Sequence, residues 1–280
     1  MGLPRSGSSG QPCPVRLRDQ KHMSDSVLLE VCADSVESAL AAQRGGAHRI
    51  ELCSGLVEGG TTPSSGLIST VRSRVSLPIC VMVRPRGGDF CYEADDFETM
   101  EQDVLTAKQL GTDGVVLGVL KEDGRVDVDR TRHLVNLARP LKTTFHRAFD
   151  MSRNLEESLD AVIAAGVDRV LTSGGEQRVE HGTTMVKTLN IAARGRIAIM
   201  AGGGINDANV HMVMAATGVR EIHASAAVSA SSPMRYRNEK ISMGAMKGRE
   251  YQRLVVLEDK VRRLLRAAVD GTTRRPVKAR

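Results

Sequence analysis

Short apolar runs recur along the chain at regular intervals, beginning near residue 27. Each run is four to six residues long and rich in Val, Ile or Leu, which is typical of strands buried on both faces of a parallel sheet. The intervals between the runs are long enough for a helix to cross over from one strand to the next. The predicted strands are Val27–Cys32, Arg49–Cys53, Ile79–Arg84, Gly114–Gly118, Thr143–His146, Arg169–Ser173, Ile197–Ala201 and Glu221–Ser225.

The intervals carry the signals of helix ends. Ser, Asp or Asn stands at the start of several intervals and Gly stands just past their end, which is the usual asymmetry of helix caps. Helices are therefore predicted over Ser35–Arg44, Asp95–Leu110, Asn154–Ala165 and Asp207–Thr217, with a closing amphipathic helix over Glu250–Ala268. Strands that alternate with helical intervals over about 245 residues favour one α/β domain, a single TIM (β/α)8 barrel, over an open sheet.

A net charge of +6 is a value that nucleic-acid-binding proteins often have, so the position of the basic residues along the chain matters. Residues 1–26 contain two more basic than acidic residues, and residues 271–280 contain four basic residues, so the segment between them is neutral overall. We expect a flexible N-terminal tail at 1–26, a barrel at 27–270 and a basic C-terminal tail at 271–280. We expect no nucleic-acid partner, because the chain has few aromatic residues on which bases could stack.

The cysteine count and the apolar content bear on the compartment. No run of 18 apolar residues occurs, so we expect no membrane span. Five cysteines form an odd number, and no secretory leader precedes them, which argues against a disulfide framework. We therefore expect a cytoplasmic protein, with a nuclear location left open.

Ionisable residues occupy the predicted inner face of the barrel. Strand residues alternate between the interior and the helix-facing side, and the apolar residues should face the helices. This alternation directs five side chains inward near the carboxyl ends of the strands, where barrel enzymes place their active sites. They are Glu30, Glu51, Arg84, His146 and His223. Because burying so many charges is costly even when they are paired, the pattern favours a functional cavity over a purely structural ion-pair network.

Two cysteines fall at equivalent places on neighbouring strands. Cys32 ends the first predicted strand and Cys53 ends the second. Adjacent strands lie about 4.8 Å apart, so both thiols could face one point inside the barrel. A pair of thiolates favours Cu(I) over hard cations. The alternative is that both residues are small apolar fillers of the core, which is the commoner role of buried cysteine.

A glycine run follows the seventh strand, and loops seven and eight of barrels often hold a phosphate. The expected anion contacts are Gly202, Gly203 and Gly204, together with Ser225 after the eighth strand. The alternative is a tight turn without a ligand.

Three further segments add candidate chemistry. Arg84 and Arg86 follow the third strand and could clamp an anion. His146 and Asp150 follow the fifth strand and could form an oriented acid–base pair. The long segment 226–249 after the last strand is expected to be a lid or an assembly surface.

Taken together, these segments resemble the CutC family of copper homeostasis proteins. The resemblance covers about residues 27–268. Its carriers are Leu29–Cys32, Arg49–Ser54, Glu58–Gly60 with Thr62–Pro63, Arg84–Phe90, Thr144–Asp150, Leu171–Gly174, Gly202–Gly204 and Pro233–Asn238. The resemblance implies a TIM barrel, a cytoplasmic homo-oligomer (dimer or tetramer), and Cu(I) bound by Cys32 and Cys53. One departure weakens the anion site, because Ala227 stands where some animal members of the family have an arginine.

Two hypotheses about function remain open. In the first, the protein is a cytosolic copper(I)-binding protein of copper homeostasis, with Cys32 and Cys53 as ligands and the two inward glutamates beside them. In the second, it is a TIM-barrel enzyme of unknown reaction that acts on a small anionic or phosphorylated metabolite. Glu30, Glu51 and His146 would then be the acid–base candidates, and the arginines and glycines named above would hold the anion.

Overall fold

The computed structural model of the 280-residue chain describes residues 27–243 and 248–273. The predicted N-terminal tail at 1–26 lies outside the described residues. Of the predicted C-terminal tail, residues from 274 onward lie outside them as well.

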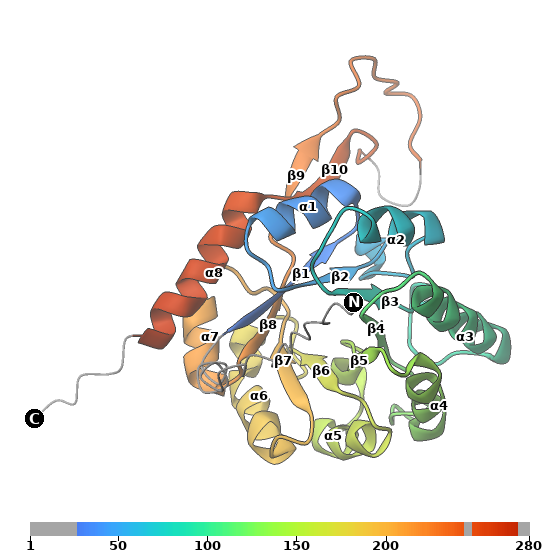
Figure 1. The fold of residues 1–280 in the computed structure, drawn as a ribbon, viewed down its shortest axis with the longest axis vertical. Helices are drawn as coiled ribbons and strands as arrows, with labels where there is room; N and C mark the ends of the chain where they lie inside the picture. The colour runs from blue at the N-terminus through green and yellow to red at the C-terminus, as the bar shows by residue number, and fades with distance from the viewer. Residues whose placement is uncertain (1–26, 244–247, 274–280) are drawn as a thin grey trace, which may run out of the picture.

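Eight parallel strands pair in sequence order and close into a barrel (Figure 1). The barrel strands are β1 (Leu28–Ala33), β2 (Arg49–Leu52), β3 (Ile79–Met82), β4 (Gly114–Leu117), β5 (Lys142–Phe145), β6 (Arg169–Thr172), β7 (Ala198–Ala201) and β8 (Glu221–Ala224). Each of them overlaps a strand predicted from the apolar runs. The predicted TIM barrel is therefore confirmed.

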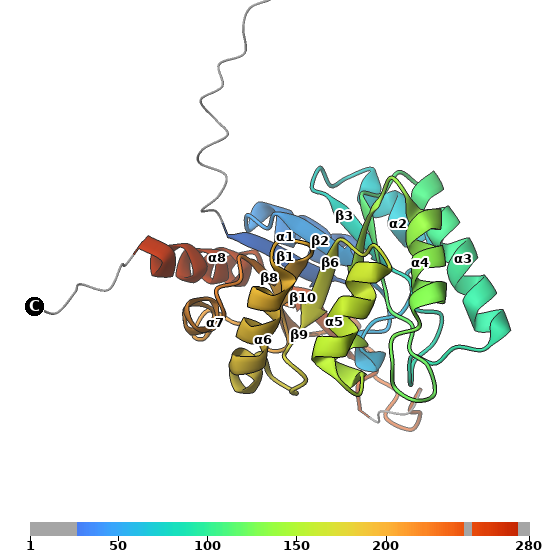
Figure 2. The same ribbon diagram turned by 90° about the horizontal axis from the view of Figure 1, so that it is seen from below.

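Helices form the outer layer around this barrel (Figure 2). The described helices are α1 (Val36–Arg44), α2 (Ser65–Arg72), α3 (Ala94–Gln109), α4 (Val128–Ala138), α5 (Leu155–Ala164), α6 (Val179–Ala193), α7 (Val210–Thr217) and α8 (Glu258–Thr273), with short 3-10 turns η1 (Leu56–Glu58) and η2 (Phe149–Met151). Polar caps begin several of them, since Ser35 accepts a hydrogen bond from the Ser38 N–H and Asn154 caps α5 in the same way. None of the described helices is long and apolar enough to cross a membrane.

The main hydrophobic core lies between the strands and the helices. Leu29, Val31, Ile50 and Leu52 are fully buried in it, on the helix-facing side of β1 and β2. A second, smaller cluster of buried residues comes from the alternate strand positions and fills the barrel interior. Its members are Cys32, Cys53, Cys80, Met82 and Val116. The two clusters show the alternation that the sequence predicted, and they place the thiols inside the barrel.

β1 occupies a central place in the closure, because it pairs with β2 on one side and with β8 on the other. The register places Glu30 opposite Arg49 on β2 and opposite His223 on β8. Three ionisable side chains that are far apart in the sequence are thereby brought to one level of the barrel.

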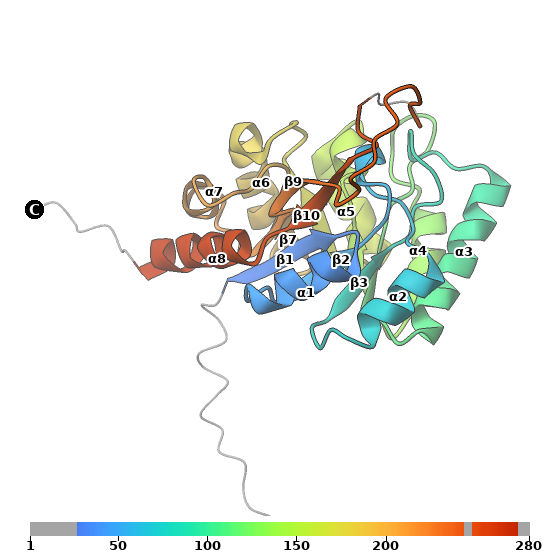
Figure 3. The same ribbon diagram turned by 90° about the horizontal axis from the view of Figure 1, so that it is seen from above.

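The segment between β8 and α8 forms a two-stranded antiparallel arm, β9 (Ala227–Ser231) and β10 (Gln252–Val256). Residues 232–243 of the chain that joins the two strands project beyond the helices (Figures 1 and 3). The predicted closing helix from residue 250 is therefore wrong over its first turns. β-branched residues favour extended backbone, and Val255 and Val256 are buried. The Val256 N–H also donates to Ser38 Oγ of α1 at 3.2 Å, so tertiary contacts settle this segment as a strand.

Candidate functional site

A cavity of about 1060 Å³ lies where the carboxyl ends of the barrel strands and their loops meet. Several of the residues that the sequence singled out line it, and they come from both halves of the barrel. They are Cys32, Glu51, Arg84, His146, Asp150, His223 and Ser225. The cavity is as large as the pockets that proteins use for small organic ligands, and larger than a single metal ion needs.

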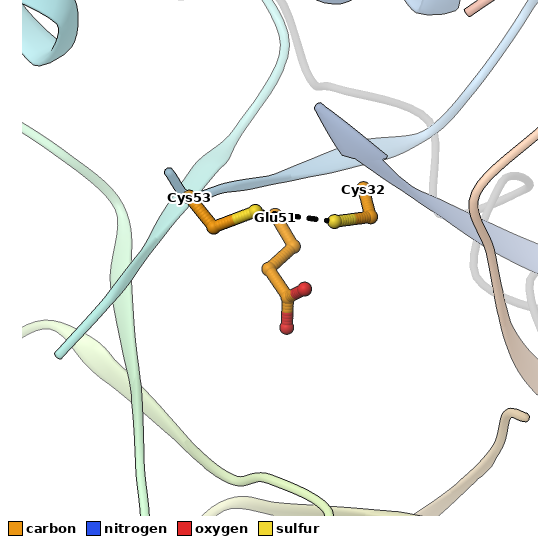
Figure 4. A group of neighbouring side chains, drawn as sticks. All are labelled: Cys32, Glu51 and Cys53. Carbon is orange, nitrogen blue, oxygen red and sulfur yellow. Dashed lines mark hydrogen bonds between the residues drawn. The ribbon is translucent and has the colours of Figure 1, made fainter. Parts of the chain in front are cut away.

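The thiols of Cys32 and Cys53 meet at one side of this cavity (Figure 4). Their sulfur atoms lie 3.4 Å apart and share a hydrogen bond. Cys32 lies near the end of β1, and Cys53 directly follows β2. Cys53 is fully buried and Cys32 is 8% exposed, so a ligand that enters from the cavity meets the Cys32 sulfur first.

Glu51 of β2 lies beside the pair, and its carboxyl group points away from the line that joins the two sulfurs (Figure 4). One ligand atom from each of Cys32, Glu51 and Cys53 lies within 4.8 Å of the others. Burial raises the pKa of the Glu51 carboxyl. The hydrogen bond with Cys53, together with burial, raises the pKa of the Cys32 thiol well above its usual value. The group therefore consists of two soft sulfur atoms beside a carboxyl group, and burial disfavours the ionised form of that carboxyl group.

Glu30 is fully buried on β1 and reaches the cavity only through His223. It accepts hydrogen bonds from Arg49 Nε and from His223 Nδ1, the latter at 2.8 Å. Burial alone would raise the pKa of Glu30, but Arg49 and His223 together lower it to about 2. His223 Nε2 lies 3.8 Å from Glu51 Oε2. Burial favours the neutral ring, but Glu51 and Glu30 raise the pKa of His223 overall, so this imidazole holds its proton between two carboxyl groups.

A second part of the network lies at the opposite end of the barrel. Arg49 Nη2 donates to Glu221 Oε2 at 3.0 Å, and Arg169 Nε pairs with the same carboxylate. These residues are the first residues of β2, β6 and β8, and the sequence analysis did not select them. The sequence signal that could have identified them is that each is a charged residue at the start of a predicted strand. One ion-pair network thus runs from the strand starts, through Arg49 and Glu30, to His223 in the cavity lining.

The structure does not pair His146 with Asp150, because Asp150 bonds to other groups. It accepts from Arg147 Nε at 2.7 Å and from Thr172 Oγ1 at 2.5 Å. It also accepts from the backbone N–H and the hydroxyl of Ser173, each at 3.0 Å. Asp150 therefore ties the loop after β5 to the end of β6.

His146 is buried and neutral. Its Nδ1 accepts a hydrogen bond from the Ala148 N–H at 3.1 Å, which leaves the ring proton on Nε2. Burial and the nearby Arg84 guanidinium lower the pKa of His146 to about 3. Within the described part of the chain, Nε2 has no hydrogen-bond partner. The ring therefore presents a donor rather than a base.

The two predicted anion clamps lie in different surroundings. Arg84 is buried and lines the cavity, and its terminal nitrogens donate to three backbone carbonyls of the loops after β2 and β3. The Arg86 side chain is 37% exposed, and its Nε pairs with Asp96 of α3 at 2.8 Å. Of the two arginines, Arg84 therefore lines the cavity and Arg86 does not.

The residues predicted to hold a phosphate do not share one surface. Ser225 is exposed and lines the cavity. Gly202–Gly204 follow β7 as predicted, but the side chains of Leu171, Arg147 and Arg178 lie against them. A Cβ at Gly202 would meet Leu171 Cδ1 at 2.4 Å, so close packing is one reason for glycine at this position.

Sequence reasoning missed one residue that shapes the cavity. The Phe90 ring centroid lies 4.9 Å from the Arg84 guanidinium carbon and 4.9 Å from the His146 ring centroid. Phe90 lies within the Arg84–Phe90 segment noted above. Because aromatic residues are scarce in this chain, a Phe in a loop after a strand was the signal that could have identified it.

An eight-stranded α/β barrel with two neighbouring buried thiols beside a buried carboxyl group defines the class, a TIM-barrel protein with a candidate metal centre. The model of the CutC family matches residues 27–228. The chain belongs to the CutC family, which confirms the resemblance stated from the sequence.

Named relatives agree with this assignment. A copper homeostasis protein cutC homolog of Mus musculus is 48% identical over 244 residues, which cover 87% of this chain and 90% of the mouse protein. The Homo sapiens homolog is 44% identical over 264 residues, covering 94% and 97%. The structure of the CutC protein of Streptococcus agalactiae is 33% identical with a TM-score of 0.67, covering 70% of this chain and 97% of that one. The N-(5'-phosphoribosyl)anthranilate isomerase of Pyrococcus furiosus, at 13% identity and a TM-score of 0.51, shares the fold alone.

Proposed function

We propose that this protein binds Cu(I) through Cys32 and Cys53 as part of copper homeostasis. The observation that carries the proposal is the 3.4 Å separation of the two sulfurs at the carboxyl-terminal mouth of the barrel. The copper homeostasis names of relatives at 44% and 48% identity support the choice of metal.

The surroundings of the thiols favour a soft monovalent ion. Cys32 and Cys53 cluster with Cys80, Met82 and Val116, so sulfur and hydrocarbon dominate this side of the interior. Thiolate and thioether ligands select Cu(I), whereas carboxylates and water suit hard cations. Glu51 lies beside the pair and offers one oxygen ligand atom against the two sulfurs.

The test is an anaerobic Cu(I) titration of the full chain against a competing chelator. We expect one Cu(I) per chain in the wild type. We expect losses in Cys32→Ser and in Cys53→Ser that exceed the about 10–100-fold typical of changes around a metal ligand. Cys91→Ser is the matched control, since Cys91 is half-buried and lines the same cavity at another place. Unchanged affinity in both Cys32→Ser and Cys53→Ser would reject the proposal.

We further propose that the protein acts in the cytoplasm as a homo-oligomer, a dimer or a tetramer. The arm between β9 and β10 supports association, because it exposes large apolar side chains of the kind that mark contact surfaces. They are Met234, Tyr236, Ile241 and Met243. Light scattering should give a mass above that of one chain, and Tyr236→Ser with Met243→Ser should lower it. A monomeric wild type at micromolar concentration would contradict this proposal.

A further inference from the structure

Arg84 is a buried cation without an anionic partner in the described part of the chain. The residue is 5% exposed, and the contacts of its terminal nitrogens are neutral carbonyl oxygens. Its Nε is buried and lacks a hydrogen-bond partner among the described residues. A buried charge that meets only neutral groups is costly, and buried unsatisfied donors in native proteins call for an explanation.

His146 presents a second unsatisfied donor to the same cavity. It is 4% exposed, and its Nε2–H has no acceptor within the described residues. The backbone is adapted to its ring, because a Cβ on Gly118 would lie 2.6 Å from His146 Cε1. The close packing of the backbone at Gly118 therefore fixes the position of the His146 ring.

The Phe90 ring packs against both of these residues. The Arg84 guanidinium carbon and the His146 ring centroid each lie 4.9 Å from the Phe90 ring centroid. Arg84 and His146 follow β3 and β5, and both line the cavity. In the closed ring β5 is opposite β1, so His146 faces the cysteine side from across the mouth.

We propose that the cavity binds a small organic carboxylate, whose carboxylate group lies against Arg84 and His146 and whose remainder extends across the mouth toward the cysteine side. A carboxylate supplies both the negative charge that Arg84 lacks and acceptor oxygens for the two unsatisfied N–H donors. The cavity of about 1060 Å³ leaves room for such a molecule, whereas a metal ion alone would leave most of it to water. This site goes beyond the copper proposal and does not depend on it.

The charge distribution favours a monocarboxylate over a phosphate. The lining contains six acidic residues against Arg84, Lys121 and Arg147, and Arg147 is already paired with Asp150. Such a lining repels a dianion more strongly than a monoanion. Of the glycines that could cradle a phosphate, Gly202 packs against Leu171, and the arginines beside Gly203 and Gly204, Arg147 and Arg178, are already paired with Asp150 and Glu180.

The test measures binding of three probes to the full chain by calorimetry and by saturation-transfer NMR. The probes are pyruvate, its uncharged counterpart hydroxyacetone, and inorganic phosphate. We expect pyruvate to bind most tightly, and we expect His146→Phe and Arg84→Met each to weaken it about tenfold or more, because each removes a hydrogen bond to a charged group. The control Arg86→Met should bind pyruvate like the wild type, because the Arg86 guanidinium pairs with Asp96 and does not line the cavity.

A measurement on the wild type covers the case in which a variant does not fold. Nitrogen NMR of the His146 ring should show a protonated Nε2 whose signal shifts when pyruvate saturates the protein. The proposal is overturned if pyruvate does not bind the wild type at millimolar concentration, if phosphate or hydroxyacetone binds as tightly, or if the ring signal does not move. An equal loss of pyruvate binding in the control Arg86→Met would likewise reject the Arg84 site.

Discussion

His223 Nδ1 lies 2.8 Å from Glu30 Oε1, and this contact joins the last strand of the barrel to the first. The same carboxylate pairs with Arg49 of β2, so one buried group links three neighbouring strands. Glu30 is fully buried and Arg49 is nearly so. An ionised carboxylate in such a place is stable only while both partners remain.

Arg49→Met should therefore destabilise the fold strongly. The substitution leaves Glu30 with one partner and removes the link to Glu221, and breaking a buried pair on one side typically costs about 3–5 kcal/mol. Urea unfolding followed by circular dichroism measures the loss. The double variant Glu30→Gln with Arg49→Met should recover part of it, because it removes the uncompensated charge.

Arg132→Met is the matched control for this prediction. Arg132 pairs with Asp129 on the exposed face of α4, where an ion pair contributes about 0–1 kcal/mol. Equal losses in the Arg49 and Arg132 variants would show that the buried network adds nothing to stability.

The stability of the protein should depend on pH through His146. Burial and Arg84 hold the pKa of His146 at about 3 in the folded state, below the usual value of 6.5. Between these two values the unfolded chain binds the additional proton, so stability rises with pH and is lost as the pH falls from 6.5 toward 3. Between pH 7 and pH 5 this residue should remove about 2 kcal/mol.

Urea unfolding of the wild type and of His146→Phe at both pH values isolates this contribution. The variant should lose less stability on acidification than the wild type, by about the stated 2 kcal/mol. His181→Gln, at an exposed histidine of α6, serves as the control and should follow the wild type. Parallel curves for the wild type and His146→Phe would mean that the imidazole is protonated inside the folded protein.

Asp150→Asn should weaken the contact between the loop after β5 and the end of β6. The Asp150 side chain is 5% exposed, and both of its oxygens accept hydrogen bonds, among others from Arg147 and Ser173. An amide turns one acceptor into a donor that faces these donors, so we expect a loss of about 2 kcal/mol or more in the free energy of unfolding. Asp129→Asn, at an exposed carboxylate, should change stability little. A loss in Asp150→Asn no larger than in that control would contradict the structural role.

The strands and the inner face of the barrel could be predicted because each depends on local pattern. The alternation of side chains along short apolar strands places Cys32 and Cys53 in the barrel interior, independently of the loop conformations. The match to the CutC family agrees with the resulting barrel. The closing helix was misjudged over residues 252–256, because a short run such as Leu254, Val255 and Val256 suits either a helix face or a strand.

Side-chain partners could not be predicted in the same way. The spacing of His146 and Asp150 is compatible with a pair, but Asp150 accepts from its neighbour Arg147 and from Thr172 and Ser173 at the end of β6, which are distant in the sequence. Likewise, nothing in the order of residues shows that Phe90 packs against both Arg84 and His146. Such contacts depend on how loops from different strands pack at the mouth, which a linear pattern does not contain.

The link between Glu30 and His223 has a consequence for how the chain acquires its fold. The two residues are separated by 193 positions, so the ribosome has made most of the protein before the second one exists. Until then the Glu30 carboxylate has no imidazole partner and β1 has an open edge. Contacts between such distant positions form slowly because a long loop must close first. A nascent chain that ends before β8 therefore already contains both thiols, but it lacks the strand that completes the ring around them.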